Sequence, residues 1–457
     1  HLAHCQDAVP AWVMPAHQVA ANVAPVPGTF DLVILDEASQ SGVEELFLFW
    51  LGKQVVVVGD KHQISPEGSF VKGDAQDLQR RHLEGWSFAG EFGPENSLFD
   101  VAEVKYVAGE VWLSEHFRCM PEIIEYSNQL CYADHRLEPV RQFGTDRLQP
   151  LRSTHVPHVP DGRAAASKIN RDEADALVAQ VLACLDDPQY RHPDGTPMTI
   201  GVISLLGTDH AKHIQRQLLE RVDPDQWMER RIHVGDAADF QGDERDVVFL
   251  SMVTTPPADG RRVPKLGHDR DRRRFNVAAS RARNQLWLFH SVELDHLNPE
   301  CPRARLLAHI RNPTRAGLDG FHDAVDPDDL RPPFESLFEQ RVFLDLVNRG
   351  YVVEPQWKVL GYRIDLVVVG ADSRLALECD GDAWHGPDRY AADLARQGDL
   401  ERVGWTFVRV KEWEYYADKS EALAPLWDAL ERLEIGPGAI AAPAATPPPF
   451  TGVLPPL

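Results

Sequence analysis

The sequence has few cysteines and no long apolar run, and each absence excludes a class of protein. Its six cysteines lie far apart and form no C-x-x-C pair, which disfavours a zinc ribbon and a disulfide framework, so we interpret them as reduced thiols. No run of about 18 apolar residues occurs, and the first residues lack the charged-then-apolar pattern of a secretion signal. We therefore expect no membrane partner and a cytoplasmic location.

Positive charge is also scarce, because 47 Lys and Arg residues face 70 Asp and Glu residues and the formal net charge is -23. Such a charge repels a polyanion, so any phosphate-binding surface must come from a local excess of Lys and Arg. Residues 261–283 contain nine Lys or Arg residues against only Asp269 and Asp271, and they form a candidate phosphate-facing surface. A solvated loop that balances acidic neighbours is the alternative interpretation.

Apolar periodicity is the main feature that is present. From Phe30 to about His290, short apolar runs alternate with amphipathic stretches, which is typical of parallel strands buried on both faces and joined by crossover helices. The runs cover residues 32–35, 55–58, 200–205, 247–250 and 286–289. A polar segment follows Pro299, and a second pattern of helix, hairpin, helix and strand begins near Phe334. The sequence therefore predicts an α/β protein with parallel sheets and a smaller α/β domain at its C-terminal end.

Acidic and amide side chains follow the first two apolar runs. The segment FDLVILDEASQ (30–40) places Asp36 and Glu37 at the C-terminal end of a strand, where ligands bind in open α/β sheets. An Asp there can hold the Mg²⁺ that bridges two phosphates, and the adjacent Glu can orient an attacking water. The next run ends in GDKHQ (59–63), whose Gln63 amide can donate to a γ-phosphate and report its loss. A solvated strand end is the alternative interpretation.

Three further segments follow in order along the chain. They are LSEHFRCMPEII (113–124), DFQGDERDVVFLS (239–251) and RRFNVAASRARNQLWLF (273–289). Together with the two strand ends, these segments resemble the motifs of superfamily 1 nucleic-acid helicases, especially the branch that includes the nonsense-mediated-decay helicase. The resemblance implies two RecA-like domains, ATP and Mg²⁺ as cofactors, and single-stranded DNA as the track, with RNA as an open alternative. An unrelated α/β protein is the competing interpretation.

The resemblance also implies roles for residues in the three segments. Arg118 is expected to reach the γ-phosphate from the second RecA-like domain. Gln241, Gly242 and Glu244 are expected to couple nucleotide binding to nucleic-acid binding. Arg281 corresponds to the finger that stabilises charge on the departing phosphoryl group, an effect worth about 10³ to 10⁵ in rate.

One family element is absent from the sequence. No G-x-x-x-x-G-K-[ST] occurs, and Lys53, which follows a Gly, stands before a strand rather than after one. Without backbone amides and a Lys around the β- and γ-phosphates, a nucleotide loses most of its binding site. We therefore expect that the isolated chain does not hydrolyse ATP and that an upstream half of the same protein supplies the P-loop.

The C-terminal region contains a cluster of carboxylates on a predicted hairpin. Two apolar runs flank the turn at 370–373, and the resulting antiparallel register places Asp365 opposite Glu378, with Cβ atoms about 4.5 to 5.5 Å apart. Asp380 projects from the same face of the strand as Glu378. Three carboxylates on one face repel one another unless a divalent cation lies among them. Neutralisation by a basic neighbour such as Arg363 is the alternative.

These carboxylates lie in segments that resemble a nuclease family. The segments are FEQRV with Glu339, YRIDLVV with Asp365, and ECDGDAWH with Glu378, Asp380 and His385. They resemble the PD-(D/E)XK nucleases, particularly the branch near the very-short-patch repair endonucleases. The resemblance implies that Asp365 and Glu378 hold Mg²⁺, or alternatively Mn²⁺, in a catalytic group that includes Glu339 and Asp380. Such a metal activates a water for phosphodiester cleavage.

The nuclease pattern also shows a departure. Asp380 stands where the family has its water-activating Lys, and His385 can act as the base in its place, although a structural role for this His is the alternative. The helix that follows supplies Asp393, Arg396 and Gln397 as polar positions on or near the site.

The combined pattern predicts five segments. They are a partial RecA-like domain at 1–112, a second RecA-like domain at 113–298, a linker at 299–333, an endonuclease-like domain at 334–433 and a disordered Pro- and Ala-rich tail at 434–457. We interpret the chain as the C-terminal part of a helicase fused to a metal-dependent DNA endonuclease of the kind used in repair or defence against foreign DNA. The alternative is a catalytically inactive nuclease fold that positions the motor on nucleic acid.

Overall fold

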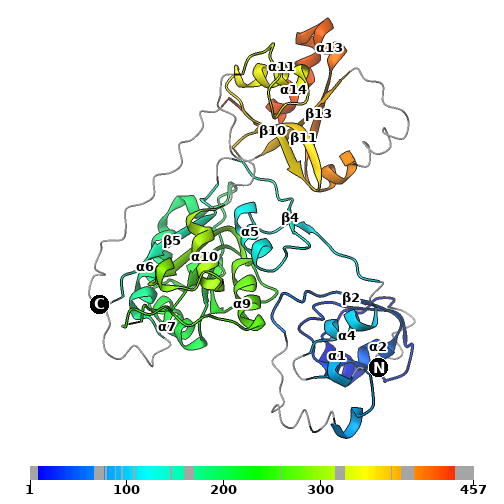
Figure 1. The fold of residues 1–457 in the computed structure, drawn as a ribbon, viewed down its shortest axis with the longest axis vertical. Helices are drawn as coiled ribbons and strands as arrows, with labels where there is room; N and C mark the ends of the chain where they lie inside the picture. The colour runs from blue at the N-terminus through cyan, green and yellow to red at the C-terminus, as the bar shows by residue number, and fades with distance from the viewer. Residues whose placement is uncertain are drawn as a thin grey trace. The chain divides into compact units, whose positions relative to one another are not determined.

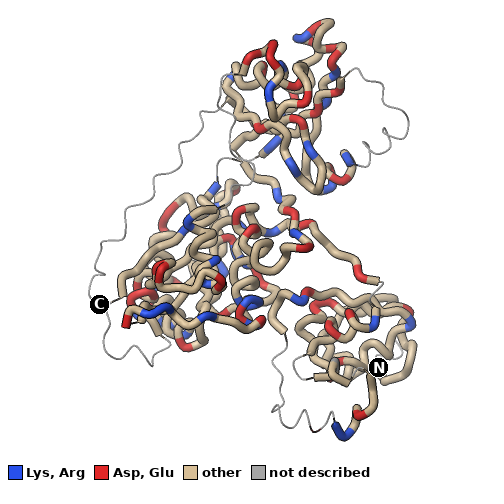
Figure 2. The backbone as a smooth tube through the Cα atoms, in the orientation of Figure 1, with Lys and Arg blue, Asp and Glu red and all other residues tan. Residues whose placement is uncertain are grey.

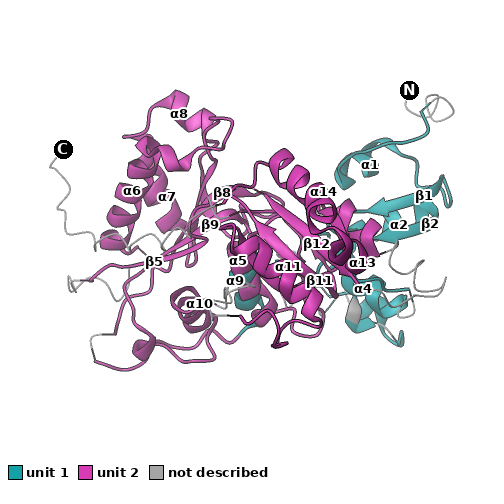
Figure 3. Cartoon of the chain, turned by 90° about the horizontal axis from the view of Figure 1, so that it is seen from above, with its two compact units in different colours: residues 1–112, 268–277 teal, residues 113–267, 278–457 magenta. Residues whose placement is uncertain are grey.

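The computed structural model describes most of the chain. The described residues are 9–65, 77, 80–87, 89–93, 96–106, 109–144, 147–158, 169–257, 259–313, 325–371, 373–381 and 396–437. The chain divides into two compact units, which are drawn in different colours in Figure 3. Unit 1 comprises residues 1–112 and 268–277, and unit 2 comprises residues 113–267 and 278–457. No helix among the described residues is both long enough and apolar enough to span a membrane.

Unit 1 contains two parallel strands, β1 (Phe30–Leu35) and β2 (Gly52–Val57). Its helices are α1 (Ala16–Asn22), α2 (Phe47–Leu51) and α4 (Leu98–Lys105). A capping box stabilises the start of α4, because Ser97 accepts from the Asp100 backbone amide and Asp100 accepts from that of Ser97. Leu48, Leu51 and Leu98 form the centre of a small core with the end of β1. This packing holds the C-terminal ends of both strands in place.

The apolar runs of unit 1 are less buried than the sequence predicted. Leu32, Ile34 and Val56 are 48%, 61% and 46% exposed, so the expectation that these strands are buried on both faces is wrong for the described part of unit 1. The physical reason is that α2 packs against one side of β1 and β2, while no other described strand or helix of this unit covers the opposite side.

Unit 2 contains a five-stranded parallel sheet with the strand order β5-β9-β8-β6-β7. Figure 1 shows this part of the chain, with the labels β5, α6, α7 and α10. The strands are β5 (Leu151–His155), β6 (Ile200–Ser204), β7 (His233–Asp236), β8 (Arg245–Ser251) and β9 (Ala282–His290). The helices of this unit are α5 (Pro121–Leu130), α6 (Arg171–Asp186), α7 (Thr208–Leu219), α8 (Pro224–Glu229) and α10 (Pro302–Arg311). A further helix, α9 (Asp269–Ala279), has residues in both units. Residues 268–277 of the α9 segment group with unit 1. Two short strands, β3 (Glu115–His116) and β4 (Glu138–Pro139), form a separate parallel pair.

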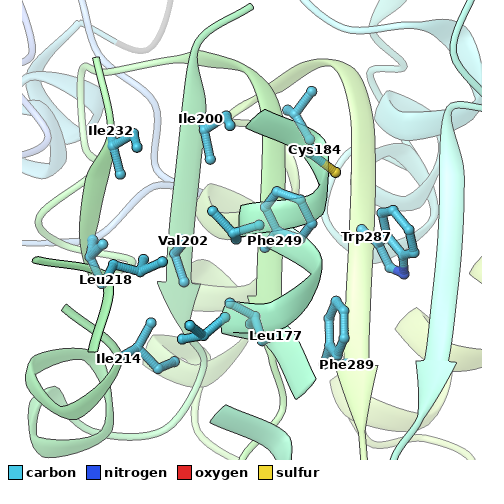
Figure 4. Close-up of a cluster of buried hydrophobic side chains, with 14 of the residues drawn as sticks. Leu177, Cys184, Ile200, Val202, Ile214, Leu218, Ile232, Phe249, Trp287 and Phe289 are labelled. Carbon is cyan, nitrogen blue, oxygen red and sulfur yellow. The ribbon is translucent and has the colours of Figure 1, made fainter. Parts of the chain in front are cut away.

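The core of this sheet explains why its strands were visible in the sequence. Every residue of β6 and β8 is buried, because helices pack on the sheet. Figure 4 shows Val202 and Phe249 of the sheet lying against Leu177 of α6 and Ile214 of α7. The three apolar runs predicted here, 200–205, 247–250 and 286–289, are therefore confirmed as central strands.

The segment 299–333, which we expected to be a linker, contains the helix α10. Leu306, Leu307 and Ile310 of this helix are buried, and α10 packs against α5 and β5. Pro302 stands in the first turn, where its missing amide hydrogen has no intrahelical acceptor to lose. The linker prediction is wrong for α10. It rested on the polar residues that follow this helix, whereas the apolar residues of α10 itself have helical spacing.

The second sheet of unit 2 has four strands in the order β10-β11-β12-β13. The strands are β10 (Val352–Val359), β11 (Tyr362–Val369), β12 (Arg374–Asp380) and β13 (Thr406–Lys411), and only the β12–β13 pair is parallel. The helices α11 (Leu337–Val347), α13 (Glu412–Ala417) and α14 (Lys419–Arg432) contribute to a core with this sheet. Short 3₁₀ turns elsewhere in the chain occupy Val43–Glu45, Ala89–Glu91, Pro188–Tyr190 and Leu294–His296.

The predicted hairpin is present in the predicted register. Val369 pairs with Arg374 and Leu366 pairs with Leu377 across β11 and β12. The fold class is confirmed as well, since a parallel-sheet α/β region precedes a separate C-terminal domain with its own mixed sheet. Of the predicted helix at 389–403, the structure describes residues 396–402 as helical.

Candidate functional site

The first candidate site lies where β1 and β2 end. Asp36 and Glu37 directly follow β1, and the amide of Val58 donates to the carbonyl of Leu35 at 2.8 Å. The amide of Ala38 donates in return to the carbonyl of Val58, also at 2.8 Å. Glu37 has a positive φ of 53°, which marks an abrupt change of chain direction after the strand. The two strand ends therefore lie side by side, as the sequence predicted.

A hydrogen-bond network joins these strand ends through Asp60, a residue that we had not singled out. The Asp60 amide donates to the Ser39 hydroxyl at 3.2 Å, and the Gln63 side-chain amide donates to Asp60 Oδ2 at 3.2 Å. Gln63 Oε1 is buried without a hydrogen-bond partner among the described residues. The neighbouring Gly59 leaves no room for a side chain, because a Cβ there would be 2.6 Å from the Phe99 ring. The Gln63 nitrogen that we expected to contact a phosphate is thus held by Asp60.

The second candidate site brings together the three later sequence motifs within unit 2. Arg118 Nε donates to Glu244 Oε2 at 2.6 Å, and Arg283 Nη1 lies 3.3 Å from Glu244 Oε1. Arg281 is 2% exposed, and its Nη1 donates to the carbonyl of Asp243 at 3.3 Å. The Glu244 carboxylate therefore contacts arginines from two different motifs, Arg118 and Arg283.

Backbone contacts explain why these distant segments meet. The amide of Met120 donates to the carbonyl of Arg283, and the amide of Arg245 donates to the carbonyl of Arg281, both at 3.0 Å. The site thus lies at the N-terminal ends of β8 and β9. Gly242, with a φ of 76°, supplies the left-handed turn before β8, and Gln241 lies in the same turn.

Arg141 belongs to this site but was missed in the sequence. Its Nη1 donates to the carbonyls of Arg118 at 3.1 Å and Arg283 at 2.9 Å, and its Nη2 donates to Asn284 Oδ1 at 2.6 Å. Burial lowers the pKa of its guanidinium. Arg141 lies outside every motif that we recognised, so only the folded chain identifies it.

The basic stretch at 261–283 includes the whole of α9. Arg262 and Arg270 are exposed, so they are available to a polyanion, whereas the exposed Lys265 pairs with Glu300. Figure 2 shows Lys and Arg residues mixed with Asp and Glu residues along the chain. The protein is acidic as a whole, so an excess of basic residues can only be local. The exposed arginines of residues 261–283 lie in the stretch whose excess of Lys and Arg was noted in the sequence.

The third candidate site is the carboxylate group on the four-stranded sheet. Asp365 lies directly before Leu366, which pairs with Leu377, and its Oδ2 accepts from the Cys379 amide at 2.8 Å. Burial raises the pKa of Asp365, and burial together with the nearby Asp365 charge raises the pKa of Glu378 to about 8. Two carboxylates therefore lie together in a poorly solvated place on neighbouring strands.

Glu339 joins this site from the first turn of α11. It is 2% exposed and accepts from the Gln356 side chain at 2.7 Å and from the Glu335 amide at 2.9 Å. Burial raises its pKa to about 7, and the charge of Asp365 acts in the same direction. Gln356 was not predicted; it has a φ of 56° and interrupts the regular pairing of β10 with β11.

Two arginines neutralise part of the carboxylate group. Arg396 forms an ion pair with Glu378, and Arg409 forms one with Asp380 at 3.1 Å. The expectation of three uncompensated carboxylates is therefore wrong for Asp380, which pairs with Arg409 on the adjacent strand, and for Glu378, which pairs with Arg396. The basic neighbour proposed from the sequence, Arg363, pairs with Glu335 instead.

The chemistry of the remaining donors still suits a hard divalent cation. Within the described part of the chain, no three His, Cys, Asp or Glu side chains are grouped as a preformed metal site. Asp365 and Glu378 nevertheless offer carboxylate oxygens, the ligands that Mg²⁺ prefers. Burial raises the pKa of both groups, and a nearby cation would favour their charged forms. The predicted His385 and Asp393 lie outside the described residues. Gln397 accepts from Arg409 at 3.2 Å and so lies next to Asp380.

Two parts of the chain match known protein families. Residues 94–293 match the AAA_12 family, described as an AAA domain. Residues 338–430 match the REase_MTES_1575 family, a restriction-endonuclease-like domain. The first match contains the arginine site of unit 2, and the second contains the carboxylate group.

Similar proteins include viral and bacterial helicases. The chain is 27% identical over 276 residues to replicase polyprotein 1ab of Alphamesonivirus 1, which covers 56% of this chain and 4% of the polyprotein. The C-terminal domain of a possible DNA helicase from Lactobacillus plantarum is 13% identical with a TM-score of 0.24, covering 40% of this chain and 91% of that one. An arterivirus helicase, nonstructural protein 10 in complex with DNA, is 14% identical with a TM-score of 0.24 and covers 56% and 38%. The chain thus spans less than half of the viral proteins.

Proposed function

Because the chain combines an AAA helicase-like domain with a restriction-endonuclease-like domain, we propose that it is the C-terminal part of an ATP-dependent superfamily 1 helicase fused to a metal-dependent DNA endonuclease. In this proposal, residues 1–112 and 113–298 belong to two RecA-like domains, and residues 334–433 form the nuclease domain. Single-stranded DNA is the proposed track, and repair or defence against foreign DNA is the proposed context. The arterivirus relative, which was solved with DNA, supports the choice of track.

The helicase part rests on the arginine site of unit 2. Arg118 and Glu244 come from motifs 126 residues apart and form a direct ion pair, with Arg281 beside them. In our proposal, Arg118 and Arg281 contact the γ-phosphate of ATP, and Glu244 links them to nucleic-acid binding through Gln241 and Gly242. Arg118 Nε donates to Glu244, so nucleotide binding would exchange one partner of Arg118 for another.

In our proposal, the strand ends of unit 1 also take part in ATP binding. Asp36 would hold Mg²⁺, Glu37 would orient the attacking water and Gln63 would sense the γ-phosphate. The exposed apolar side chains of β1 and β2, such as Ile34, support a further part of the proposal, because parallel strands are normally covered on both faces. We propose that an upstream segment carrying the P-loop covers them.

ATP turnover by the purified chain with Mg²⁺ and single-stranded DNA tests this proposal. We expect no turnover from residues 1–457 alone, and turnover after the upstream coding sequence is joined to them. Arg281→Ala should then abolish the activity, because the finger stabilises charge on the leaving phosphoryl group. Turnover by the 457-residue chain that Arg281→Ala abolishes would contradict the need for an upstream P-loop.

The nuclease part rests on the buried pair of Asp365 and Glu378 with Glu339 beside it. Asp365 and Glu378 would hold Mg²⁺ or Mn²⁺, which supplies Lewis acidity and an activated water for phosphodiester cleavage. Glu339, with its raised pKa, can hold or release a proton near neutral pH. Arg396 must leave Glu378 free to ligate, so it is the side chain expected to turn toward the scissile phosphate. His385 remains the proposed base.

A plasmid-nicking assay with Mg²⁺ or Mn²⁺ tests the nuclease proposal. The Asp365→Asn, Glu378→Gln double variant should lose nicking, because the carboxylate charges that hold the cation are removed while the shapes are kept. Asp345→Asn is the matched control, since Asp345 lies in the same domain and contacts Tyr415 and Lys419 instead. Nicking that persists in the double variant would contradict the proposal.

A binding module without catalysis is the second candidate function. The specific observation in its favour is that Arg396 and Arg409 already neutralise Glu378 and Asp380, and that Asp380 replaces the family Lys. This candidate predicts metal-independent DNA binding and no nicking by the wild-type chain. The same assay therefore separates the two functions.

A further inference from the structure

A cavity of about 390 Å³ lies between the α5 region of unit 2 and the four-stranded sheet of the same unit. It is lined on one side by residues that include Phe143 and Arg136, and on the other by Trp357, Arg374, Trp405 and Lys358. The lining thus combines aromatic, basic and apolar side chains with two carboxylates, Glu125 and Glu138, and Glu125 pairs with Arg136 at 2.5 Å. The carboxylate group described above contributes none of the cavity lining.

Arg374 is the central residue of this cavity. It is 5% exposed, and its guanidinium carbon lies 4.2 to 4.8 Å from the ring centroids of Phe143, Trp357 and Trp405. Burial lowers its pKa to about 9, so the guanidinium carries its charge at neutral pH. No ion pair joins Arg374 to a carboxylate in the described part of the chain.

The guanidinium is only partly satisfied by hydrogen bonds. Its Nε donates to Gln142 Oε1 at 3.3 Å, and its Nη2 donates to the carbonyl of Arg141 at 3.2 Å. Arg374 Nη1, Trp405 Nε1 and Gln142 Nε2 are all buried and have no hydrogen-bond partner among the described residues. All three atoms are donors, and a buried positive charge without a counter-anion is costly. Neither carboxylate of the lining, Glu125 or Glu138, accepts a hydrogen bond from these three atoms, so the donors lack an acceptor among the described residues.

We propose that this cavity is a phosphate-binding site that holds a phosphate group of a nucleic-acid strand or of a nucleotide. A phosphate presents several strong acceptor oxygens in different directions, which matches the donors that Arg374 and Trp405 contribute from the lining. Gln142 is not part of the lining but contacts Arg374. Lys358 is an exposed basic residue in the lining, where it adds positive charge for an incoming anion.

The position of the cavity on the sheet favours a polymer as the source of the phosphate. Arg374 and Glu378 are four residues apart on β12, so they project from the same face, about 13 Å apart along the strand. A nucleic-acid strand held at Arg374 can therefore place another of its phosphates at the carboxylate group. The choice of a nucleic-acid strand over a nucleotide rests on the proposed nuclease function. The proposal that the cavity binds phosphate does not depend on that function.

Thermal unfolding and tryptophan fluorescence titrations with inorganic phosphate test the site. A ligand that binds the folded state raises the unfolding midpoint, so phosphate should raise it for the wild-type chain. Gln142→Glu places a carboxylate beside Arg374 and should abolish the phosphate effect while raising the midpoint without phosphate. Trp405→Phe keeps the ring, removes one donor and should weaken phosphate binding about tenfold. These variants keep Arg374, whose deletion would leave a void between the domains.

Arg349→Met is the matched control, because Arg349 also stacks on a tryptophan, Trp427, at 4.0 Å but lies outside the cavity. Its phosphate response should equal that of the wild type. A wild-type chain that shows no response to phosphate, or responses that remain unchanged in Gln142→Glu and Trp405→Phe, would overturn the proposal.

Competition distinguishes the two sources of the phosphate group. An oligothymidylate that displaces phosphate at concentrations where AMP does not would identify a nucleic-acid strand, and the reverse would identify a nucleotide; either result supports the site. The Asp365→Asn, Glu378→Gln variant should retain phosphate binding. Failure of the nuclease proposal and failure of the phosphate site are therefore measured separately.

Discussion

At the residue scale, Glu173 shows how a single buried carboxylate sets the pH dependence of stability. It accepts from the Ser251 hydroxyl and from the Val253 amide at 2.8 Å, and it is fully buried. Burial raises its pKa to about 7, and these hydrogen bonds only partly oppose that effect. Because the folded state holds this proton more tightly than the unfolded chain, stability is present below pH 4.5 and is lost as the pH rises toward 7.

We expect the free energy of unfolding to fall between pH 5 and pH 8 in the wild type, and Glu173→Gln to remove on the order of 3 kcal/mol of that fall. Urea unfolding at four pH values measures the difference. Glu293→Gln is the control, because Arg311 lowers the pKa of Glu293 and its titration lies outside this window. Parallel pH curves for the wild type and Glu173→Gln would contradict the assignment.

At the element scale, α10 belongs to the folded core rather than to a linker. Leu307 is fully buried, whereas Arg305 on the same helix is exposed. Leu307→Ala should therefore cost about 2 to 5 kcal/mol in the free energy of unfolding, and Arg305→Ala should change it by less than about 0.5 kcal/mol. Chemical denaturation followed by circular dichroism measures both. If both substitutions left the free energy of unfolding unchanged, the helix would not contribute to the core.

At the scale of the whole molecule, a net charge of -23 means that nucleic-acid binding must depend on few basic contacts. Each phosphate contact with single-stranded nucleic acid contributes about 0.7 to the slope of log K against log salt. Arg262→Gln with Arg270→Gln should therefore reduce that slope by about 1.4 in anisotropy titrations with an oligonucleotide. Arg349→Gln, a charge change elsewhere, should leave the slope as it is. An unchanged slope in the double variant would exclude the 261–283 stretch as the phosphate-facing surface.

Much of the fold was predictable because its signals are local. The strands of the parallel sheet appear as continuous apolar runs, since both faces are buried, and the β11–β12 register follows from the turn length. The exposed faces of β1 and β2 were not predictable, because an apolar run does not reveal whether a second layer is present to cover it.

The sequence by itself determined the fold class, the order of the motifs and the shared face of Asp365 and Glu378, because these depend on neighbours within a few residues. Only the tertiary structure decided that Arg409 neutralises Asp380, that Gln356 supports Glu339, and that Arg374 is buried among three aromatic rings. These contacts join segments that are distant in the chain. Such contacts produce no periodic pattern and no fixed spacing in the sequence, so they could not be predicted from it.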